Sequence, residues 1–106
     1  TTAEIYDPVS GEWSPAGEMS EWRVLHSATL LTDGRVMVAG GLPEVSSTDV
    51  YDPATGTWTP GTPLRGPRYG QTSTTLSDNR VLLAGGNSVD SSGDRNITAD
   101  SEIYEP

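Results

Sequence analysis

The side chains able to take part in chemistry in this chain are carboxylates, arginines and one histidine. Fifteen Asp and Glu residues accompany six basic residues, all of them Arg, and there is no Cys. His26 has no second His or thiol with which to bind a metal ion or form a nucleophile–base pair. We interpret it as a packed polar residue or one that lines a channel. No phosphate-binding Gly-rich loop or pair of catalytic carboxylates is evident, so we predict no catalytic residues, no cofactor, no metal site and no enzymatic activity.

An oxygen-rich segment spans residues 87–100 and carries Asp90, Asp94 and Asp100 among Ser, Gly and Asn. Such segments can bind Ca²⁺, but the spacing of these acids does not match the EF-hand pattern. We therefore interpret the segment as a solvated loop. Loops on a rigid scaffold are frequent binding sites, and Asp90, Asp94 and Arg95 accordingly belong to a candidate ligand-binding face.

Two arginines 45 positions apart, Arg23 and Arg68, are further candidates for that face. Each could meet an acidic ligand, or each could pair with a carboxylate of its own repeat. Trp22 precedes the first of them and does not recur, because Pro67 occupies the matching position. An unrepeated Trp is a common anchor of protein interfaces. We therefore include Trp22 in the candidate face, together with Tyr69, and expect a protein or glycan as the ligand.

The elements that must position these side chains repeat along the chain. Residues 3–41 align with residues 48–86 without a gap, with 15 identities in 39 positions. A Tyr-Asp-Pro tripeptide, a Gly and a Trp recur, followed by a hydrophobic segment that ends in Gly-Gly. A third Tyr unit lies at residues 103–106. A fixed period of this size indicates a repeat architecture, in which a single unit cannot bury its apolar face alone.

Each period contains four segments typical of β-strands, denoted a to d in chain order, and none with helical periodicity. In the complete period, a spans residues 25–31, b spans 35–39, c spans 48–52 and d carries Trp58. The chain then contains c-d, a-b-c-d and a-b-c, which makes nine strands of an all-β fold. We divide the single unit 1–106 into a partial c-d segment (3–20), a full sheet (23–60) and a sheet lacking strand d (68–106).

The residues at the turns and strand ends predict the form of each connection. The a–b turns at Asp33-Gly34 and Asp78-Asn79 are expected to be two-residue hairpins, because these residues accept positive φ. Strand b is nearly all apolar, as in strands covered on both faces, and ends in Gly-Gly, which permits sharp exits and close backbone approach. The short turns should lie at one side of the sheets and the variable connections, with the candidate face, at the other.

The combined pattern resembles the kelch repeat: a hydrophobic strand, a double Gly, a Tyr, six intervening residues and a Trp. The resemblance covers essentially the whole chain. It implies four-stranded antiparallel blades of a β-propeller with strand a innermost, as in bacterial kelch and galactose-oxidase-like propellers. It also implies that the repeated residues are structural and pack between blades. These residues are Tyr6, Trp13, Gly40, Gly41, Tyr51, Trp58, Gly85, Gly86 and Tyr104.

The galactose-oxidase-like members of this fold are copper enzymes with a ligand set that includes histidines and a cross-linked Cys–Tyr pair. This chain departs from that set, because it has no Cys and one His. One alternative function is therefore an excerpt of such an enzyme with its active residues elsewhere. A second alternative is a protein- or glycan-recognition module of a secreted bacterial kelch protein.

Two blades share one interface and leave apolar surface on their open flanks. Arrays of this kind usually need three or more units. We therefore expect the chain, a two-blade fragment or designed unit, to assemble head to tail into a closed homo-oligomer of four, six or eight blades. A neighbour's Trp13 strand would complete the blade without strand d, so that residues 3–8 and 101–106 compete for one place. The leading interpretation is thus a non-catalytic unit whose role is assembly and whose loops provide a binding face.

Composition excludes several classes of partner. A net charge of −9 disfavours binding to nucleic acid and to anionic membranes. No apolar run reaches the about 18 residues of a membrane-spanning helix, and the sequence does not open with the basic and apolar stretches of a secretion signal. We attribute the acidity to solubility. Abundant Ser, Thr, Gly and Asp without Lys or Cys would suit an extracellular bacterial parent, although we assign no localisation.

Overall fold

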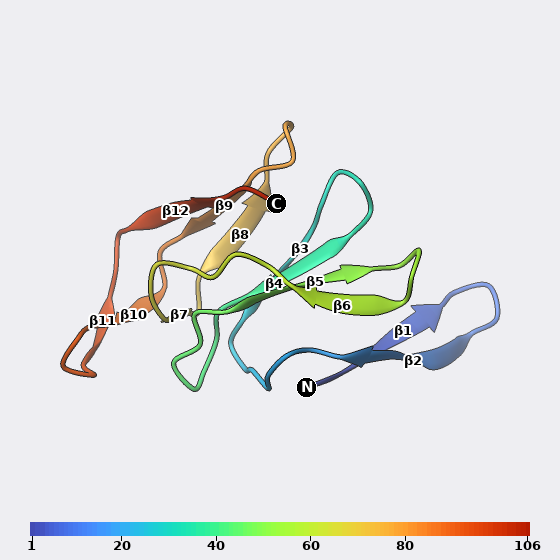
Figure 1. Cartoon of the computed structure of the whole chain (residues 1–106), viewed down its shortest axis with the longest axis horizontal. Helices are drawn as coiled ribbons and strands as arrows, with labels where there is room; N and C mark the ends of the chain where they lie inside the picture. Colours follow the sequence, from blue (N-terminus) through green and yellow to red (C-terminus); the bar gives the residue numbers. More distant parts are fainter.

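The computed structural model describes all residues, 1–106, and contains twelve short β-strands and no helix. The strands are grouped in sheets that follow one another along the longest axis of the molecule, which measures 47 Å (Figure 1). Every strand pair is antiparallel. The predicted all-β fold of propeller-type sheets is therefore confirmed. No helix long or apolar enough to cross a membrane is present.

Three groups of strands correspond to the predicted c-d, a-b-c-d and a-b-c segments. The complete blade has the order β3 (Ser27–Leu30), β4 (Val36–Ala39), β5 (Thr48–Asp52) and β6 (Thr57–Pro60). The N-terminal hairpin consists of β1 (Thr2–Asp7) and β2 (Glu12–Glu18). The three-stranded blade consists of β8 (Thr72–Thr75), β9 (Val81–Ala84) and β12 (Ser101–Tyr104), in the order β12-β9-β8. The outer edge of β12 is thus unpaired.

Three further strands correct the expectation of nine. β7 (Arg68–Tyr69), β10 (Asn87–Val89) and β11 (Arg95–Ile97) form a small sheet in the order β11-β10-β7. The segment 87–100, expected to be a loop, therefore contains a hairpin. Its turn is closed by Asp90, whose Oδ1 accepts hydrogen bonds from the backbone N–H groups of Ser92 and Asp94, each at 2.9 Å. These local bonds bring β10 and β11 into register.

The a–b turns also differ from the expected two-residue form. The Leu31 N–H donates to the Arg35 carbonyl at 2.8 Å, and the Gly34 N–H donates to the Leu31 carbonyl at 3.1 Å. Residues 32–34 therefore form a three-residue loop between the hydrogen-bonded residues Leu31 and Arg35, and Gly34 at its third position has a φ of +92°. This is the bulged three-residue hairpin, which requires a left-handed residue at that position. Asn79, with a φ of +72°, has the same role between β8 and β9.

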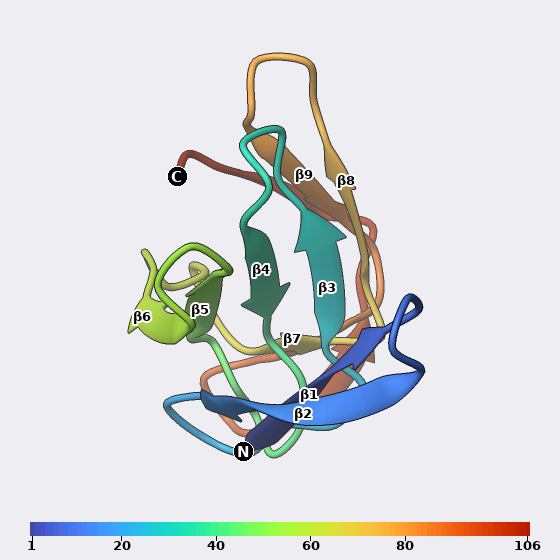
Figure 2. The ribbon, with the colours of Figure 1, turned by 90° about the vertical axis from the view of Figure 1, so that its right-hand side faces the viewer.

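The hydrophobic core lies between the complete blade and the three-stranded blade. Figure 2 looks along the row of blades and shows β3 and β4 in front of β8 and β9. Strand β4 is covered on both faces, whereas β9 alternates buried and half-buried residues because no further sheet covers its other face. The core residues are Leu31, Met37, Ala39, Val50, Leu64, Val81, Leu83 and Tyr104.

The glycines after β4 permit the close approach of these two blades. The Gly41 N–H donates to the Arg68 carbonyl at 2.7 Å, and a Cβ at Gly40 would overlap that same carbonyl oxygen. The φ of Gly41 is +111°, a conformation that other residues rarely adopt. The Gly-Gly pair therefore lets the connection after β4 pack tightly against the segment that carries Arg68.

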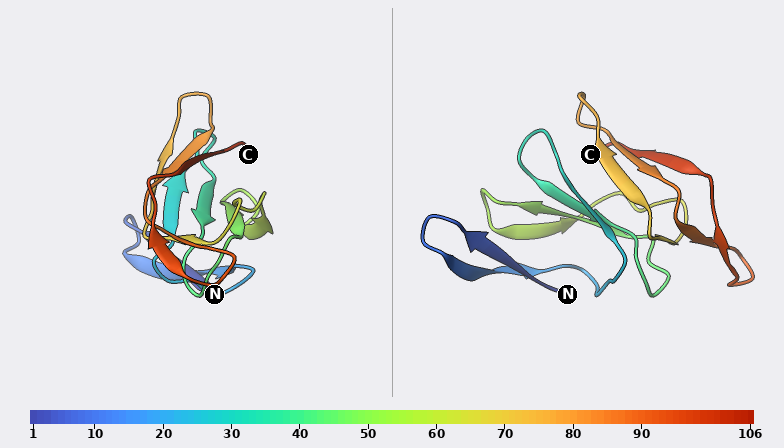
Figure 3. Two further views of the ribbon diagram at one scale, coloured as in Figure 1. Left: turned by 90° about the vertical axis from the view of Figure 1, so that its left-hand side faces the viewer. Right: turned by 180° about the vertical axis from the view of Figure 1, so that it is seen from behind.

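The N-terminal end of the row leaves one repeated aromatic pair uncovered. Tyr6 and Trp13 are 48% and 64% exposed, whereas Tyr51 is 9% exposed and Trp58 is half-buried. The ring centroids are 5.2 Å apart in both the Tyr6–Trp13 and the Tyr51–Trp58 pair. The two pairs therefore have similar geometry and differ in how much of their surface is exposed to solvent. The right-hand view of Figure 3 shows the reason, since the N-terminal hairpin stands at one end of the row and β12 at the other.

Candidate functional site

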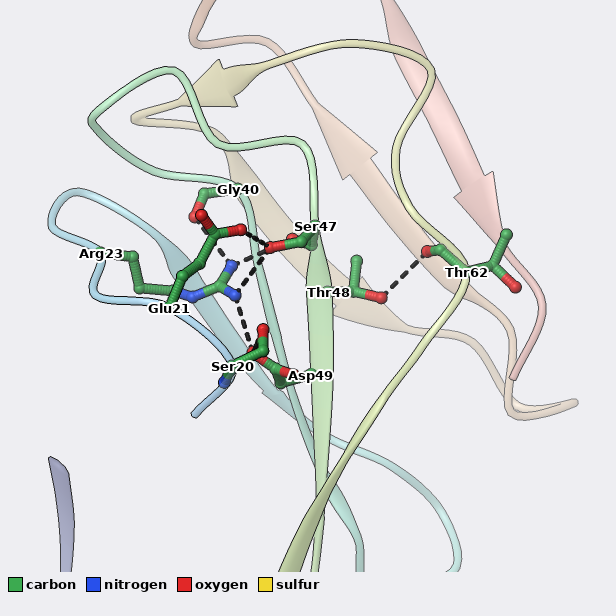
Figure 4. Close-up of polar contacts among 8 residues, drawn as sticks. All are labelled: Ser20, Glu21, Arg23, Gly40, Ser47, Thr48, Asp49 and Thr62. Atoms are coloured by element: carbon green, nitrogen blue, oxygen red, sulfur yellow. Dashed lines mark hydrogen bonds and ion pairs between the residues drawn. The ribbon is translucent and has the colours of Figure 1, made fainter. Parts of the chain in front are cut away.

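The most extensively hydrogen-bonded polar cluster of the molecule surrounds Arg23, in the connection before β3 (Figure 4). Arg23 Nη1 donates to the carbonyls of Gly40 and Ser47, each at 3.0 Å. Arg23 Nη2 forms an ion pair with Asp49 Oδ2 at 2.8 Å, and the two side chains are 0% and 1% exposed. Arg23 thus joins the end of β4 to β5 inside the blade. The Arg23 Nε and Asp49 Oδ1 atoms are buried and have no partner within the chain.

Asp49 also fastens the preceding connection to the blade. Its Oδ2 accepts hydrogen bonds from the Ser20 N–H at 3.2 Å and the Ser20 hydroxyl at 2.8 Å. The Ser47 hydroxyl accepts from Arg23 Nη2 at 3.0 Å and donates to Glu21. The Asp49 carboxylate on β5 therefore accepts hydrogen bonds from Ser20 and Arg23, both in the connection between β2 and β3.

The three-stranded blade repeats this arrangement around Arg68. Arg68 Nη1 donates to the carbonyls of Gly85 and Asp100 at 2.8 and 2.9 Å, and Nη2 pairs with Glu102 Oε2 at 3.3 Å. Glu102 Oε1 accepts from the Arg65 N–H at 2.8 Å, as Asp49 accepts from Ser20. Every partner of Arg68 stands at the repeat position of a partner of Arg23. The two clusters thus have the same arrangement, and we call each of them an internal brace: Arg23 with Asp49 in the first repeat, and Arg68 with Glu102 in the second.

This geometry corrects the placement of Arg23 and Arg68 in a ligand-binding face. Their side chains point into the blades, because carbonyl and carboxylate acceptors at the strand ends satisfy them there. Each arginine has the other role that the sequence left open, pairing with the carboxylate of its own repeat. The acceptors that sequence reasoning did not name, Asp49 and Glu102, could have been found from their shared position two residues before a repeated Tyr.

The remaining residues of the predicted face lie in three separate places. The Arg95 guanidinium lies 6.0 Å from the centroid of the Tyr69 ring, and its Nη2 is 3.7 Å from Glu44 Oε1. Asp90 organises its own turn, and its Oδ2 accepts from Asn96 at 3.3 Å. Trp22 is 57% exposed on the connection after β2. The structure thus brings Tyr69 and Arg95 together, while Asp90 and the exposed Asp94 belong to the turn between β10 and β11.

An open polar hollow of about 340 Å³ adjoins the second brace. Arg65 lines it, and this residue stands where the first repeat has Ser20. The Arg65 guanidinium forms no ion pair, so it is the one arginine of the chain without a carboxylate partner. Sequence reasoning missed Arg65 because its position is not a repeated arginine. The hollow is lined by Arg65, Gly66, Pro67, Arg68, Ser88, Val89, Asp100, Ser101 and Glu102.

His26 lies immediately before β3, and its surface is exposed although the ring is partly desolvated by its neighbours. Partial burial, and secondarily the charge of Arg23, lower the pKa of His26 below its ordinary value of 6.5. The residue at the same repeat position, Gln71, is buried and donates to Ser27 and to the Ala39 carbonyl, each at 3.0 Å. The two repeats therefore use this position differently, and only Gln71 bridges two blades.

No group of three or more His, Cys, Asp or Glu side chains is arranged to hold a metal ion. Asp33, Asp49, Asp78 and Glu102 form the shortest ion pairs of the chain, and each pairs with a different arginine. These carboxylates therefore do not share one site.

No family model matches the sequence, and no curated protein sequence matches it either. Solved structures do match. The chain is similar to a fungal alcohol oxidase. That structure is described as a novel fungal alcohol oxidase with catalytic diversity among the AA5 family, in complex with copper. The superposition has a TM-score of 0.77 and 26% sequence identity, and it covers 99% of this chain and 22% of the oxidase. The likeness supports the propeller-type fold, and this chain spans less than a quarter of the oxidase's length.

The residues of this chain do not fit a copper centre. A copper site built on nitrogen and sulfur donors needs several such side chains in one place. Here His26 is the one imidazole, no thiol exists, and the arginine-paired carboxylates are held apart in separate pairs. We therefore derive no chemical step through copper in this chain.

Proposed function

We propose that the chain is a non-catalytic propeller unit that assembles head to tail with further copies into a closed ring and presents its variable loops for binding. The observation that carries the proposal is that two Tyr–Trp pairs with similar geometry differ in solvent exposure. Trp58 packs against the preceding hairpin, whereas Trp13 is 64% exposed with no sheet before it. A neighbouring copy would supply the missing sheet.

The apolar surface that remains exposed at the two open flanks is large for a chain of this size. Burying a large aromatic side chain removes roughly 150–250 Å² from water, which stabilises by about 4–6 kcal/mol at about 25 cal/mol per Å². Trp13 retains more than half of its surface, and Tyr6, Ile5 and Ile103 are 48%, 41% and 51% exposed. Covering both flanks in one head-to-tail contact would therefore stabilise the chain by several kcal/mol. Since each chain contributes two blades, closed rings would have four, six or eight blades.

Coupling of folding to assembly can be tested through the thermal midpoint. We expect the midpoint of the wild-type chain to rise with protein concentration, because assembly stabilises the folded state by mass action. Trp13→Ala should lower the midpoint and abolish its dependence on concentration. Trp22→Ala is the matched control, because Trp22 is also exposed, at 57%, but lies in a loop and not on a flank. A wild-type midpoint that is independent of concentration would contradict the proposal.

The loop face is proposed to bind a protein or glycan through Trp22 and the Tyr69–Arg95 pair. Stacking of Arg95 near Tyr69 leaves an aromatic and a cationic group at one surface. Trp22→Ala should weaken ligand binding without changing the oligomer. If Trp22→Ala dissociates the oligomer instead, the residue belongs to the assembly contact and this site assignment fails.

A second candidate function follows from the likeness to the AA5 oxidase. In that case the chain is a propeller segment of a galactose-oxidase-like enzyme and supports active residues located elsewhere. Titration of the 106-residue chain with Cu²⁺ distinguishes a supporting segment from a complete centre. We expect no stoichiometric tight binding by calorimetry, and a tight site of one copper ion per chain would contradict both candidates.

A further inference from the structure

We propose that the N-terminal hairpin of one copy replaces β12 in the three-stranded blade of the next copy, with Glu4 taking the place of Glu102 on Arg68. This inference rests on the proposed self-assembly and specifies its contact. The occupant is a second copy of this chain, because the chain itself contains both halves of the contact and shows one example of it joined.

The joined example is the packing of Trp58 on the N-terminal hairpin. The Trp58 indole N–H donates to the Ala16 carbonyl at 2.8 Å, and the ring lies against Gly17, where a Cβ would be 3.5 Å from it. The positions 45 residues later are Gly61 and Thr62. They line an open hollow together with Tyr104, and no Trp occupies it. The chain thus presents a vacant Trp position at Gly61 and an uncovered Trp13.

The N-terminal hairpin is already shaped to fill that position. Tyr6 lies directly opposite Trp13 in the β1–β2 register, as Tyr51 lies opposite Trp58 in the complete blade. The ring pairs share a centroid distance of 5.2 Å, with interplanar angles of 44° and 50°. The hairpin can therefore dock as a formed c-d unit, without rearranging its own aromatic pair.

Strand alternation decides between replacing β12 and adding to it. In a replacement, β1 pairs with β9 in the place of β12, and Trp13 faces the preceding blade as Trp58 does. In an addition, the free edge of β2 would pair with β12. Antiparallel pairing through that opposite edge turns the strand over, and side chains that alternate with period two would then place Trp13 on the far face of the sheet. Only replacement brings Trp13 to Gly61.

Charge supports the same choice. Glu4, Asp49 and Glu102 each stand two residues before a repeated Tyr, and the latter two pair with buried arginines. Glu4 is exposed and takes part in no ion pair or side-chain hydrogen bond of the chain. When β1 replaces β12, Glu4 meets Arg68 and Tyr6 takes the place of Tyr104. The contacts of strand c are then conserved, Arg68 stays paired, and the displaced Glu102 passes into water. The gain is strand d with Trp13.

Engineered cysteines test the contact directly, because the chain has none of its own. Leu82 on β9 lies opposite Ile103 on β12, and Ile5 is the repeat equivalent of Ile103. The double variant Ile5→Cys/Leu82→Cys should form disulfides between chains under mild oxidation, giving covalent multimers on a non-reducing gel. The control Leu82→Cys/Ile103→Cys should form a disulfide within one chain, hold β12 in place and yield monomers that assemble again after reduction.

Charge-neutral variants provide a second measurement. Glu4→Gln should raise the protein concentration at half assembly by about tenfold or more, because a charge-assisted hydrogen bond to a buried arginine becomes a weaker one to a neutral amide. Glu102→Gln should leave that concentration unchanged or lower it, since it weakens only the strand that is displaced. Glu12→Gln, an exposed residue at the start of β2 in the same hairpin, is the matched control and should have no effect.

The outcomes separate the two proposals. A chain that is monomeric at every concentration overturns both self-assembly and strand replacement. Replacement alone is overturned by an oligomer that forms normally in Glu4→Gln, is weakened by Glu102→Gln and gives no covalent multimers in the Ile5→Cys/Leu82→Cys variant. Addition to the β12 edge would then be the contact.

Discussion

Replacing Asp49 with Asn tests the internal brace, which holds the connection before β3 to the blade. The change is nearly isosteric, but it leaves the Arg23 guanidinium charged and buried without its partner 2.8 Å away. Breaking one side of a buried ion pair costs about 3–5 kcal/mol. For a chain of about a hundred residues, each kcal/mol corresponds to about 4 °C or more in the thermal midpoint. Asp49→Asn should therefore lower the midpoint by about 12 °C or more at fixed protein concentration.

The chain offers a matched control for that measurement. Asp33 pairs with Arg35 at the same distance of 2.8 Å, but the Arg35 and Asp33 side chains are 36% and 43% exposed. Exposed pairs contribute about 0–1 kcal/mol, so Asp33→Asn should shift the midpoint by only a few degrees. Urea unfolding monitored by tryptophan fluorescence gives the two free-energy differences.

A conservative variant keeps the test informative if Asp49→Asn does not fold. Asp49→Glu retains the charge and reproduces the Arg68–Glu102 pair of the other repeat, in which the ion-pair distance is 3.3 Å. It should fold and lose less stability than Asp49→Asn. Equal losses for Asp49→Asn and Asp33→Asn would refute the reasoning that burial gives the brace its weight.

Three further predictions concern single positions. Partial burial lowers the pKa of His26 in the folded chain, so the unfolded chain binds a proton first as the pH falls. The free energy of unfolding should therefore decrease as the pH drops through about 6.5. In His26→Gln, urea unfolding measured above and below this pH should no longer show the decrease that His26 causes. Gly41→Ala should destabilise the chain by several kcal/mol more than Gly34→Ala. Both glycines have positive φ, but a Cβ at Gly41 would lie 2.7 Å from the Val24 carbonyl oxygen, whereas a Cβ at Gly34 meets nothing within 4 Å. Equal losses in calorimetry would contradict the close approach of the Val24 carbonyl to Gly41. Trp58→Ala should lower stability by about 3–5 kcal/mol even in the dissociated chain, measured by urea unfolding at high dilution, and a loss below about 1 kcal/mol would show that the indole contact with the hairpin contributes little.

Much of the fold could be predicted because the repeat fixes what each strand must do. Tyr51 and Trp58 sit opposite each other on β5 and β6, and their spacing in the sequence already implied two strands joined by a tight turn. The bounds of β5, Thr48–Asp52, agree with the predicted strand. The a–b turn was predicted at the right residues but with the wrong length, because Asp-Gly is compatible with both a two-residue and a bulged three-residue hairpin.

The candidate face was harder to predict, because it depends on where long side chains point. Arg23 and Arg68 are surface residues by type, and nothing local shows that carbonyls at two strand ends and a carboxylate on strand c converge on them. Their equivalence indicated a repeated role without saying which one. The β10–β11 hairpin was missed because its strands are three residues long and polar, so they lack the apolar alternation that marks a strand.

Molar mass in dilute solution tests the central claim most directly, namely that copies of this chain cover one another's open flanks. Sedimentation equilibrium over a range of concentrations should show one closed species whose mass is two, three or four times 11.2 kDa. A species of 11.2 kDa that unfolds cooperatively and stays solitary at all concentrations would contradict the account.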